Sequence, residues 1–227
     1  MTISKSRRPA RSGLGRLPRE QAKPLPKPRK RPIQDRAKFT IEAIYGAFVR
    51  IWTRDGAQAV TMRAVAEEAG FAIGTLYEYF PNKTALHSGY VRHAIDRLLA
   101  RIDRQTIAAE GGDWRARLAT LVAVTCGADD SAPFFDAEML RLEGTIAEAR
   151  HHRRAFEELS ARWTQALRGW SDLPAQPPQA TIDALVLAVW GARRYRLILD
   201  APDGRLAGWV GEITAICENA LAAQESP

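Results

Sequence analysis

Residues 61–80 read TMRAVAEEAGFAIGTLYEYF, and this stretch decides the fold. Thr61 offers a hydroxyl that can cap a short helix over residues 62–69. Gly70 supplies the positive φ that a sharp turn commonly demands, and Pro81 ends a second short helix. Two short helices joined by a tight turn predict a helix-turn-helix.

The second short helix, over residues 73–80, has an inward and an outward face. Leu76 and Phe80 stand four residues apart, so both are predicted to be core. On the outward face, Ile73 offers apolar contact, Gly74 lets the backbone approach a DNA groove, and Thr75 offers a methyl and a hydroxyl to a base edge. The alternative for Gly74 is that it only makes room for the preceding helix.

Five polar side chains around this helix are candidate contacts to the DNA backbone. Tyr77, Tyr79 and Lys83 are placed to bind phosphate oxygens, although Tyr79 could instead be half buried. Thr61 could contact a phosphate, but capping alone would explain it. Arg63 lies in the first turn of its helix, where a cation opposes the helix dipole, so we expect it to contact phosphate or guanine.

The segment closely resembles the N-terminal motif of the TetR (tetracycline-repressor) family. The resemblance is carried by Ala66 to Gly70, Gly74 to Tyr77, Tyr79-Phe80 and Lys83 to Leu86. Members commonly have Ser or Thr before the recognition helix, where this chain has Ala72. A side-chain N-cap is therefore missing, which is expected to cost about 1 kcal/mol of local stability.

Outside this segment, apolar residues recur at three- and four-residue steps between Gly- and Pro-rich breaks. Helices are predicted over 34–53, 62–69, 73–80, 83–103, 113–126, 134–167 with a split near Gly144, 179–199 and 205–223. No alternating strand pattern and no internal repeat is present. The sequence therefore predicts an all-α protein.

The charge is distributed unevenly along the chain. The formal net charge is +7, but residues 1–38 hold 13 basic and two acidic residues, a local net of +11, which leaves −4 for residues 39–227. Residues 1–32 contain six prolines and few large apolar side chains, so we expect a disordered basic arm. This arm is either a solubilising tail or an auxiliary contact to DNA.

The predicted domains are the arm over residues 1–32, a three-helix DNA-binding domain over 33–82 and a helical domain over 83–223. The resemblance implies that the third domain senses an effector and forms a homodimer through the last two long helices. One side of each of these helices is apolar: Ile182, Leu185, Val186, Val189 and Trp190 on the first, and Trp209, Ile213, Ile216 and Leu221 on the second. Packing within one chain is the alternative for both sides.

An effector pocket in the helical domain is a further expectation from the resemblance. The candidate lining residues are Phe134, Phe135, Met139, Trp163, Trp190 and Tyr195, although aromatic residues at helical spacing are more often plain core. The run Arg193, Arg194 and Arg196 suits an anionic effector, and an acid-paired surface is the alternative.

Other classes of protein have little support in the sequence. Cys126 and Cys217 lie in no CxxC or Cys/His cluster, so neither a metal nor a cofactor is expected. His151 and His152 are adjacent and cannot chelate from one helix face. No GxSxG, HExxH or Walker-type motif indicates an enzyme. No apolar run could span a bilayer and no secretory signal is evident, so we expect a soluble cytoplasmic protein.

These observations predict a sequence-specific transcriptional regulator of double-stranded DNA. A two-fold pair of recognition helices reads two half-sites about one helical turn apart, so the operator should be close to palindromic. The resemblance implies a repressor that a small-molecule effector releases from this operator. The alternative is an architectural DNA-binding protein, largely independent of sequence and driven by the basic arm.

Overall fold

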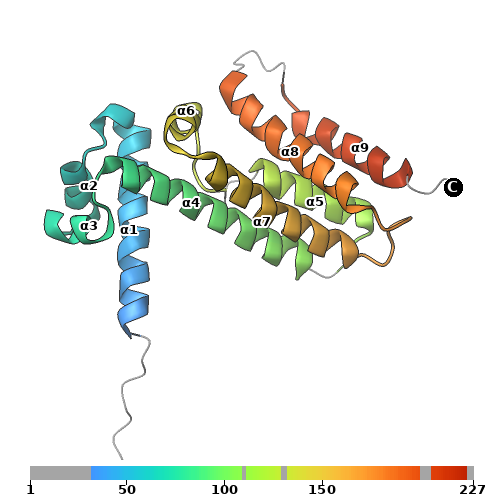
Figure 1. The fold of residues 1–227 in the computed structure, drawn as a ribbon, viewed down its shortest axis with the longest axis horizontal. Helices are drawn as coiled ribbons and strands as arrows, with labels where there is room; N and C mark the ends of the chain where they lie inside the picture. Colours follow the sequence, from blue (N-terminus) through green and yellow to red (C-terminus); the bar gives the residue numbers. More distant parts are fainter. Residues whose placement is uncertain (1–31, 109–110, 129–131, 200–205, 224–227) are drawn as a thin grey trace, which may run out of the picture. The chain divides into compact units, whose positions relative to one another are not determined.

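The computed structural model of the chain describes residues 32–108, 111–128, 132–199 and 206–223 (Figure 1). The predicted basic arm lies almost wholly outside the described residues. Residues 1–38 and 39–227 form separate units, and the packing described below concerns the second. Within the described ranges every regular element is helical and no strand is present, which confirms the all-α prediction.

The helices follow the predicted breaks closely. Their bounds are α1 Pro32–Asp55, α2 Met62–Ala69, α3 Ile73–Tyr79, α4 Lys83–Ile102, α5 Trp114–Cys126, α6 Ala137–Ile146, α7 Ala149–Arg168, α8 Gln179–Leu199 and α9 Trp209–Ala222. A 3₁₀ turn, η1 (Ala57–Ala59), follows α1, and a π-helical turn, η2 (Asp103–Ile107), continues α4.

The local signals at the helix-turn-helix act as predicted. Thr61 Oγ1 accepts a hydrogen bond from Ala64 N at 3.0 Å at the start of α2. Gly70 closes α2 with a φ of 75°, a left-handed conformation that favours glycine. Ala72 precedes α3 without a side-chain cap bond, so the expected missing cap is confirmed.

The predicted helix over 134–167 is two helices, which confirms the split predicted near Gly144, although Gly144 itself lies inside α6. Asp136 Oδ1 caps α6 by accepting from Met139 N at 2.8 Å, so the helix begins three residues later than predicted. Ala147 then takes an extended conformation, and α7 begins after Glu148. The apolar pattern alone did not fix the bounds, because it continues across the carboxylate cap at Asp136 and the extended residue Ala147.

The helix-turn-helix region, residues 39–82, is called the reading head below, and α4 to α9 the body. The core of the reading head is rich in aromatic residues, among them Phe48, Trp52 and Phe80. Tyr90 of α4 and Met139 of α6 also belong to this core, so its packing crosses the predicted domain boundary at residue 82.

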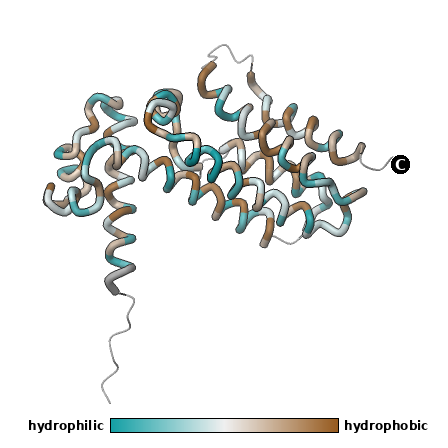
Figure 2. Tube along the Cα trace, viewed as in Figure 1, coloured by the Kyte–Doolittle hydropathy of each residue, from teal (hydrophilic) through white to brown (hydrophobic). Residues whose placement is uncertain are grey.

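The body has its own core around α5, which contacts α4, α8 and α9. Trp163 of α7 is fully buried there, and its Nε1 donates to Thr125 Oγ1 of α5 at 3.2 Å. Along the tube in Figure 2, brown hydrophobic residues alternate with teal hydrophilic ones, as expected for helices that bury one side.

This packing corrects the expectation that the apolar side of α8 pairs with a second copy of the chain. Ile182, Leu185, Val186 and Val189 are all buried in the body's own core. Packing within the chain therefore accounts for the apolar side of α8. Any contact between two copies must use another side of this helix.

Candidate nucleic-acid interface

Helix α3 has the two faces that its sequence predicted. Leu76 is fully buried in the core of the reading head and Phe80 is 7% exposed. On the opposite side, Ile73 is 43% exposed and Tyr77 is 51% exposed, which is unusual for such large apolar surfaces. Since nothing in the described chain covers these side chains, they are available to a partner.

Gly74 lies on the same outward side, and its surroundings decide between the two expectations for it. A Cβ built at Gly74 would have no heavy atom within 4 Å. The glycine therefore does not make room for α1 or for any other described element. The open space above it is consistent with close approach of another molecule.

Thr75 and Tyr79 lie at the edges of this face and are half buried. The ring of Tyr79 packs against the core of the reading head, with its centroid 6.5 Å from that of Phe80. Tyr79 is therefore anchored by packing, which was the alternative expected for it.

Thr61 and Arg63 are exposed at the start of α2. Arg63 Nε forms an ion pair with Glu67 Oε1 at 2.9 Å, one helical turn away. The expectation that Arg63 has no local stabilising reason to be there is therefore wrong. Both side chains are largely exposed, so the pair contributes little and opens at small cost when a phosphate competes.

Lys83, at the first position of α4, points back toward η1. Its Nζ donates to the carbonyl oxygen of Ala57 at 2.8 Å. The lysine thus holds the turn after α1 against the start of α4.

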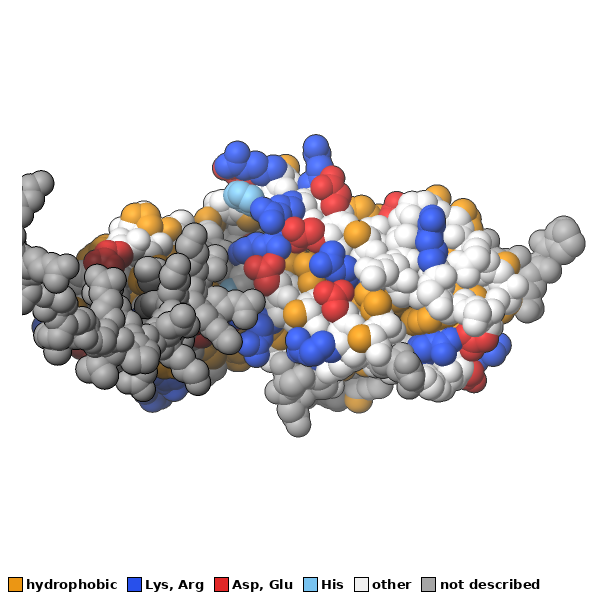
Figure 3. All heavy atoms as spheres, turned by 90° about the horizontal axis from the view of Figure 1, so that it is seen from below, with side chains coloured by type: hydrophobic (Ala, Val, Ile, Leu, Met, Phe, Trp, Pro, Cys, Tyr) orange, Lys and Arg blue, Asp and Glu red, His pale blue; other side chains and the backbone are white. Residues whose placement is uncertain are grey.

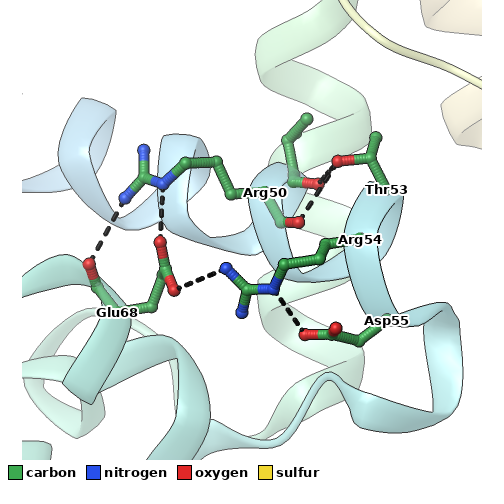
Figure 4. Close-up of polar contacts among 6 residues, drawn as sticks. Arg50, Thr53, Arg54, Asp55 and Glu68 are labelled. Carbon is green, nitrogen blue, oxygen red and sulfur yellow. Dashed lines mark hydrogen bonds and ion pairs between the residues drawn. The ribbon is translucent and has the colours of Figure 1, made fainter.

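Two arginines that the sequence did not single out join α1 to α2 (Figure 4). Arg50 Nε donates to Glu68 Oε1 at 2.7 Å, and Arg54 Nη1 donates to Glu68 Oε2 at 3.2 Å. Hydrogen bonds from Arg50 and then Arg54 lower the pKa of the Glu68 carboxyl. Glu68 lies 18 positions after Arg50 and 14 positions after Arg54, and no local sequence pattern links residues at these separations. This clamp between α1 and α2 depends on how the two helices cross.

Two hydrogen bonds converge on the residues before α6, one from the reading head and one from α4. Trp52 Nε1 of α1 donates to Asp136 Oδ2 at 2.7 Å, and Tyr90 Oη of α4 donates to the carbonyl oxygen of Phe134 at 2.6 Å. Burial raises the pKa of the Tyr90 phenol, so it stays a donor.

His87 lies beside this junction. Its ring stacks on Trp52 with centroids 5.9 Å apart, and the residue is 3% exposed. Nε2 has no hydrogen-bond partner among the described residues. Burial lowers the pKa of the imidazole, which favours the neutral ring.

The residues expected to form an effector pocket do not all come together. Phe135 and Trp190 line one small cavity between α4 and α8. Met139 and Trp163 are fully buried, in the core of the reading head and of the body respectively. Phe134 packs against the reading head, and Tyr195 is exposed on α8.

Basic and acidic side chains lie side by side on the face of the body seen in Figure 3. Glu158 of α7 accepts from Arg92 Nη1 at 2.6 Å and from Arg154 Nε at 2.9 Å. Charges of opposite sign neutralise one another here, so this surface lacks the uniformly basic character typical of a DNA-binding face.

Other kinds of site find no support in the described part of the chain. Within it, no group of three or more His, Cys, Asp or Glu side chains could hold a metal ion. Among the same residues, no helix is long and apolar enough to cross a membrane. Burial raises the pKa of both thiols, of Cys126 to about 12 and of Cys217 to about 11.

Comparison with known proteins places the reading head in a family. Residues 44–88 match the family model described as bacterial regulatory proteins, tetR family. The HTH-type transcriptional repressor KstR of Mycolicibacterium smegmatis is 38% identical over 98 residues, which are 43% of this chain and 47% of that protein. KstR of Mycobacterium tuberculosis is 42% identical over 65 residues, 29% of this chain and 30% of the relative. The matches thus span about half or less of the length of these curated relatives.

Solved structures resemble more of the chain. A transcriptional regulator from Rhodococcus has a TM-score of 0.60 at 17% identity, covering 82% of this chain and 98% of that one. A TetR-family regulator from Streptomyces coelicolor has a TM-score of 0.56 at 21% identity, covering 81% and 98%. The fold of the body is therefore shared with these regulators, while the reading head also shares sequence. Over residues 44–88 the chain is similar in sequence to the TetR family of bacterial regulatory proteins, and its fold resembles that of solved transcriptional regulators.

Proposed function

We propose that this protein is a homodimeric transcriptional repressor that binds a near-palindromic DNA operator and leaves it when a small molecule binds the body. The observation that supports DNA reading best is the outward face of α3. Ile73 and Tyr77 are exposed beside the open space over Gly74, while Leu76 on the opposite side fixes the helix to the core. An α-helix with such a face fits the major groove of B-DNA.

Residues in two roles would contact the DNA. Ile73, Gly74 and Thr75 are proposed to lie against base edges, where methyl groups and hydroxyls distinguish thymine and other bases. The proposed backbone contacts are Thr61, Arg63, Tyr77, Tyr79 and Lys83. These side chains position the reading head without specifying the sequence.

The dimer contact is proposed on the exposed side of α8 together with α9. Leu187, Gly191, Tyr195 and Leu199 follow one another at four-residue steps along α8, and the three larger side chains are 52–63% exposed. Ile216 of α9 is 57% exposed. A soluble chain rarely leaves such an apolar stripe uncovered, and two copies of this helix pair would form a four-helix interface.

The switch is proposed to act through α4, because this helix belongs to both cores. Tyr90 packs in the core of the reading head, and Leu98 and Ile102 pack in that of the body. A ligand that changes the body can therefore move the reading heads out of register with the two half-sites. A coupling free energy of about 1–3 kcal/mol suffices to change operator occupancy.

Selection of bound sequences from a random DNA pool tests the proposal. We expect a consensus with two inverted half-sites whose centres lie about one helical turn apart. Tyr77→Ala should weaken binding to the selected site, whereas Arg168→Ala, an exposed change at the far end of α7, should not. A pool that shows no enriched sequence would overturn the proposal.

The basic arm offers a second route to DNA, through neutralisation of phosphates. Binding of the full chain to the selected operator and to random DNA should be compared over a range of salt concentrations. A specific regulator prefers its operator by about 10³-fold or more. Equal affinities with a steep salt dependence would instead favour the architectural function.

A further inference from the structure

Two adjoining cavities lie between α4 and the helices that cover it. The inner cavity, of about 30 Å³, is bounded by α4, α6, α8 and the residues Gly127, Pro133 and Phe135. The outer cavity, of about 330 Å³, is bounded by α4, the end of α6 and the start of α7. Val91, Ile95 and Glu143 line both, so the two cavities adjoin at these side chains.

The inner cavity has apolar walls and arginines at one end. Leu98, Phe135, Trp190 and Leu197 are among its apolar lining residues. Arg101, Arg193 and Arg194 line it as well, and Glu143 is the acidic residue among its described lining. Three guanidinium-bearing side chains therefore line one small cavity.

The carboxylate of Glu143 is already engaged by other residues. Its Oε2 lies 3.0 Å from Arg194 Nη1, and its Oε1 lies 3.7 Å from His152 Nδ1. Arg194 is therefore acid-paired, as the sequence alternative expected. Glu143 also acts on Arg193 through its charge, although the two form no direct ion pair among the described residues.

Arg193 is not paired directly with an acid in this way. Among the described residues it forms no ion pair, and its guanidinium lies 5.0 Å from the ring centroid of Trp190. Burial, the largest cause, and the neighbouring charges of Arg101 and Arg194 together lower the pKa of Arg193 to about 10. A desolvated cation on an apolar wall is the environment in which an anion gains most from pairing.

The sizes of the two cavities suit the two parts of an amphipathic molecule. A cavity holds one water when about 10–15 Å³ is accessible to its centre, so the inner cavity accepts a group as small as a carboxylate. The outer cavity falls in the range of about 300–1,000 Å³ typical of small-molecule sites. Its lining includes the buried His87, whose Nε2 lacks a described partner.

We propose that these cavities bind an amphipathic monocarboxylate, with its apolar body in the outer cavity and its carboxylate against Arg193 in the inner one. The ligand passes beside Glu143, between Val91 and Ile95. This assignment rests on the proposed function, since it names the chemical class of the effector. The site lies against α4, the helix that joins the two cores.

Calorimetric titration of the DNA-free, full-length protein tests the assignment with two probes of equal chain length. Octanoate has the anionic group and 1-octanol lacks it. We expect the wild-type protein to bind octanoate at least tenfold more tightly than 1-octanol. Arg193→Gln should abolish that preference while leaving the affinity for 1-octanol within about twofold. Arg196→Gln, on the same helix but outside both cavities, should retain the preference.

Folding of the variants is checked independently of binding. Arg193→Gln removes a desolvated charge, so its thermal unfolding midpoint should be no lower than that of the wild type. Arg193→Lys retains the charge and should keep a preference for octanoate. Equal binding of the two probes by the wild type, or an unchanged preference in Arg193→Gln, would overturn the assignment.

Failure of this proposal and failure of the proposed function give different results. A protein that selects an inverted-repeat operator but does not prefer octanoate is still a DNA-binding regulator, and the carboxylate site is then wrong. A protein that prefers octanoate through Arg193 but selects no operator keeps the ligand site and loses the proposed function.

Discussion

The reading head and the body differ in which side chains they leave at the surface and which polar groups they hold inside. The reading head packs Phe48, Trp52 and Leu76 inside and exposes the apolar side chains of Ile73 and Tyr77 on its surface. The body has polar groups inside as well, among them His87 and Arg193 at cavities beside α4. This difference supports the proposals that the reading head binds DNA at its surface and that the body binds a small molecule at its cavities.

The largest effect on stability is expected on the two faces of α3, where a substitution of the buried face should cost far more than one of the exposed face. Leu76→Ala removes a fully buried side chain and should lower the free energy of unfolding by about 2–5 kcal/mol. Tyr77→Ala, at the next residue, should change it by about 0.5 kcal/mol or less, because Tyr77 is half exposed. Urea unfolding at fixed protein concentration measures both, and similar losses in the two variants would contradict the assignment of faces.

Gly74→Ala separates stability from DNA binding on the same helix. Alanine favours a helix over glycine by about 0.5–1 kcal/mol, and the added Cβ meets no atom, so the unfolding midpoint should stay or rise. Affinity for the selected operator should nevertheless fall by about tenfold or more, since the methyl group holds the backbone away from the groove. If DNA binding were unchanged while stability rose, Gly74 would have no role in DNA reading.

The buried imidazole of His87 predicts a moderate dependence on pH. Its pKa is below the ordinary 6.5 in the folded protein, because burial disfavours the cation. Protonation is then easier in the unfolded chain, so stability is lost as the pH falls from about 6.5 toward the lowered pKa. His87→Phe keeps an aromatic ring beside Trp52 and should lose less stability between pH 7.5 and pH 5.5. An identical loss in wild type and variant would assign the effect to other groups.

The smallest effect is expected at the exposed clamp between α1 and α2. Hydrogen bonds from Arg50 and Arg54 hold the pKa of Glu68 below its ordinary 4.5. The carboxylate therefore stabilises the fold above about pH 4.5, and this contribution is lost as the pH falls through the lowered value. Glu68→Gln should cause a small loss of stability at pH 7 that disappears at high salt. Glu78→Gln, on the exposed face of α3, is the matched control and should cause none.

Much of the reading head could be predicted from the sequence, because its signals are local. The cap at Thr61 needs an amide three residues away, and the turn at Gly70 needs only a backbone conformation. Leu76 and Phe80 point the same way because they are four residues apart on a helix. The inward face of α3 followed from these signals. Contact of its outward face with DNA remains a proposal.

The helices of the body were predicted from the sequence, but the contacts of their side chains were predicted less well. Six residues were candidates for one pocket, but only Phe135 and Trp190 line the same cavity. Periodicity identifies the buried side of a helix without saying which neighbour buries it, so the apolar side of α8 could not be assigned to its own core or to a second copy. The same limit applied to α6, which an Asp136 cap separates from the preceding residues.

The sequence by itself determined the helical class, the helix-turn-helix and the residues that face out of it, since each depends on contacts within one or two turns. Tertiary structure alone decided the rest. It joined Arg50 to Glu68, joined Trp52 to Asp136 over 84 positions, and brought Arg193 to a cavity beside α4. These contacts depend on how separate helices pack, and no local pattern of residues specifies that packing.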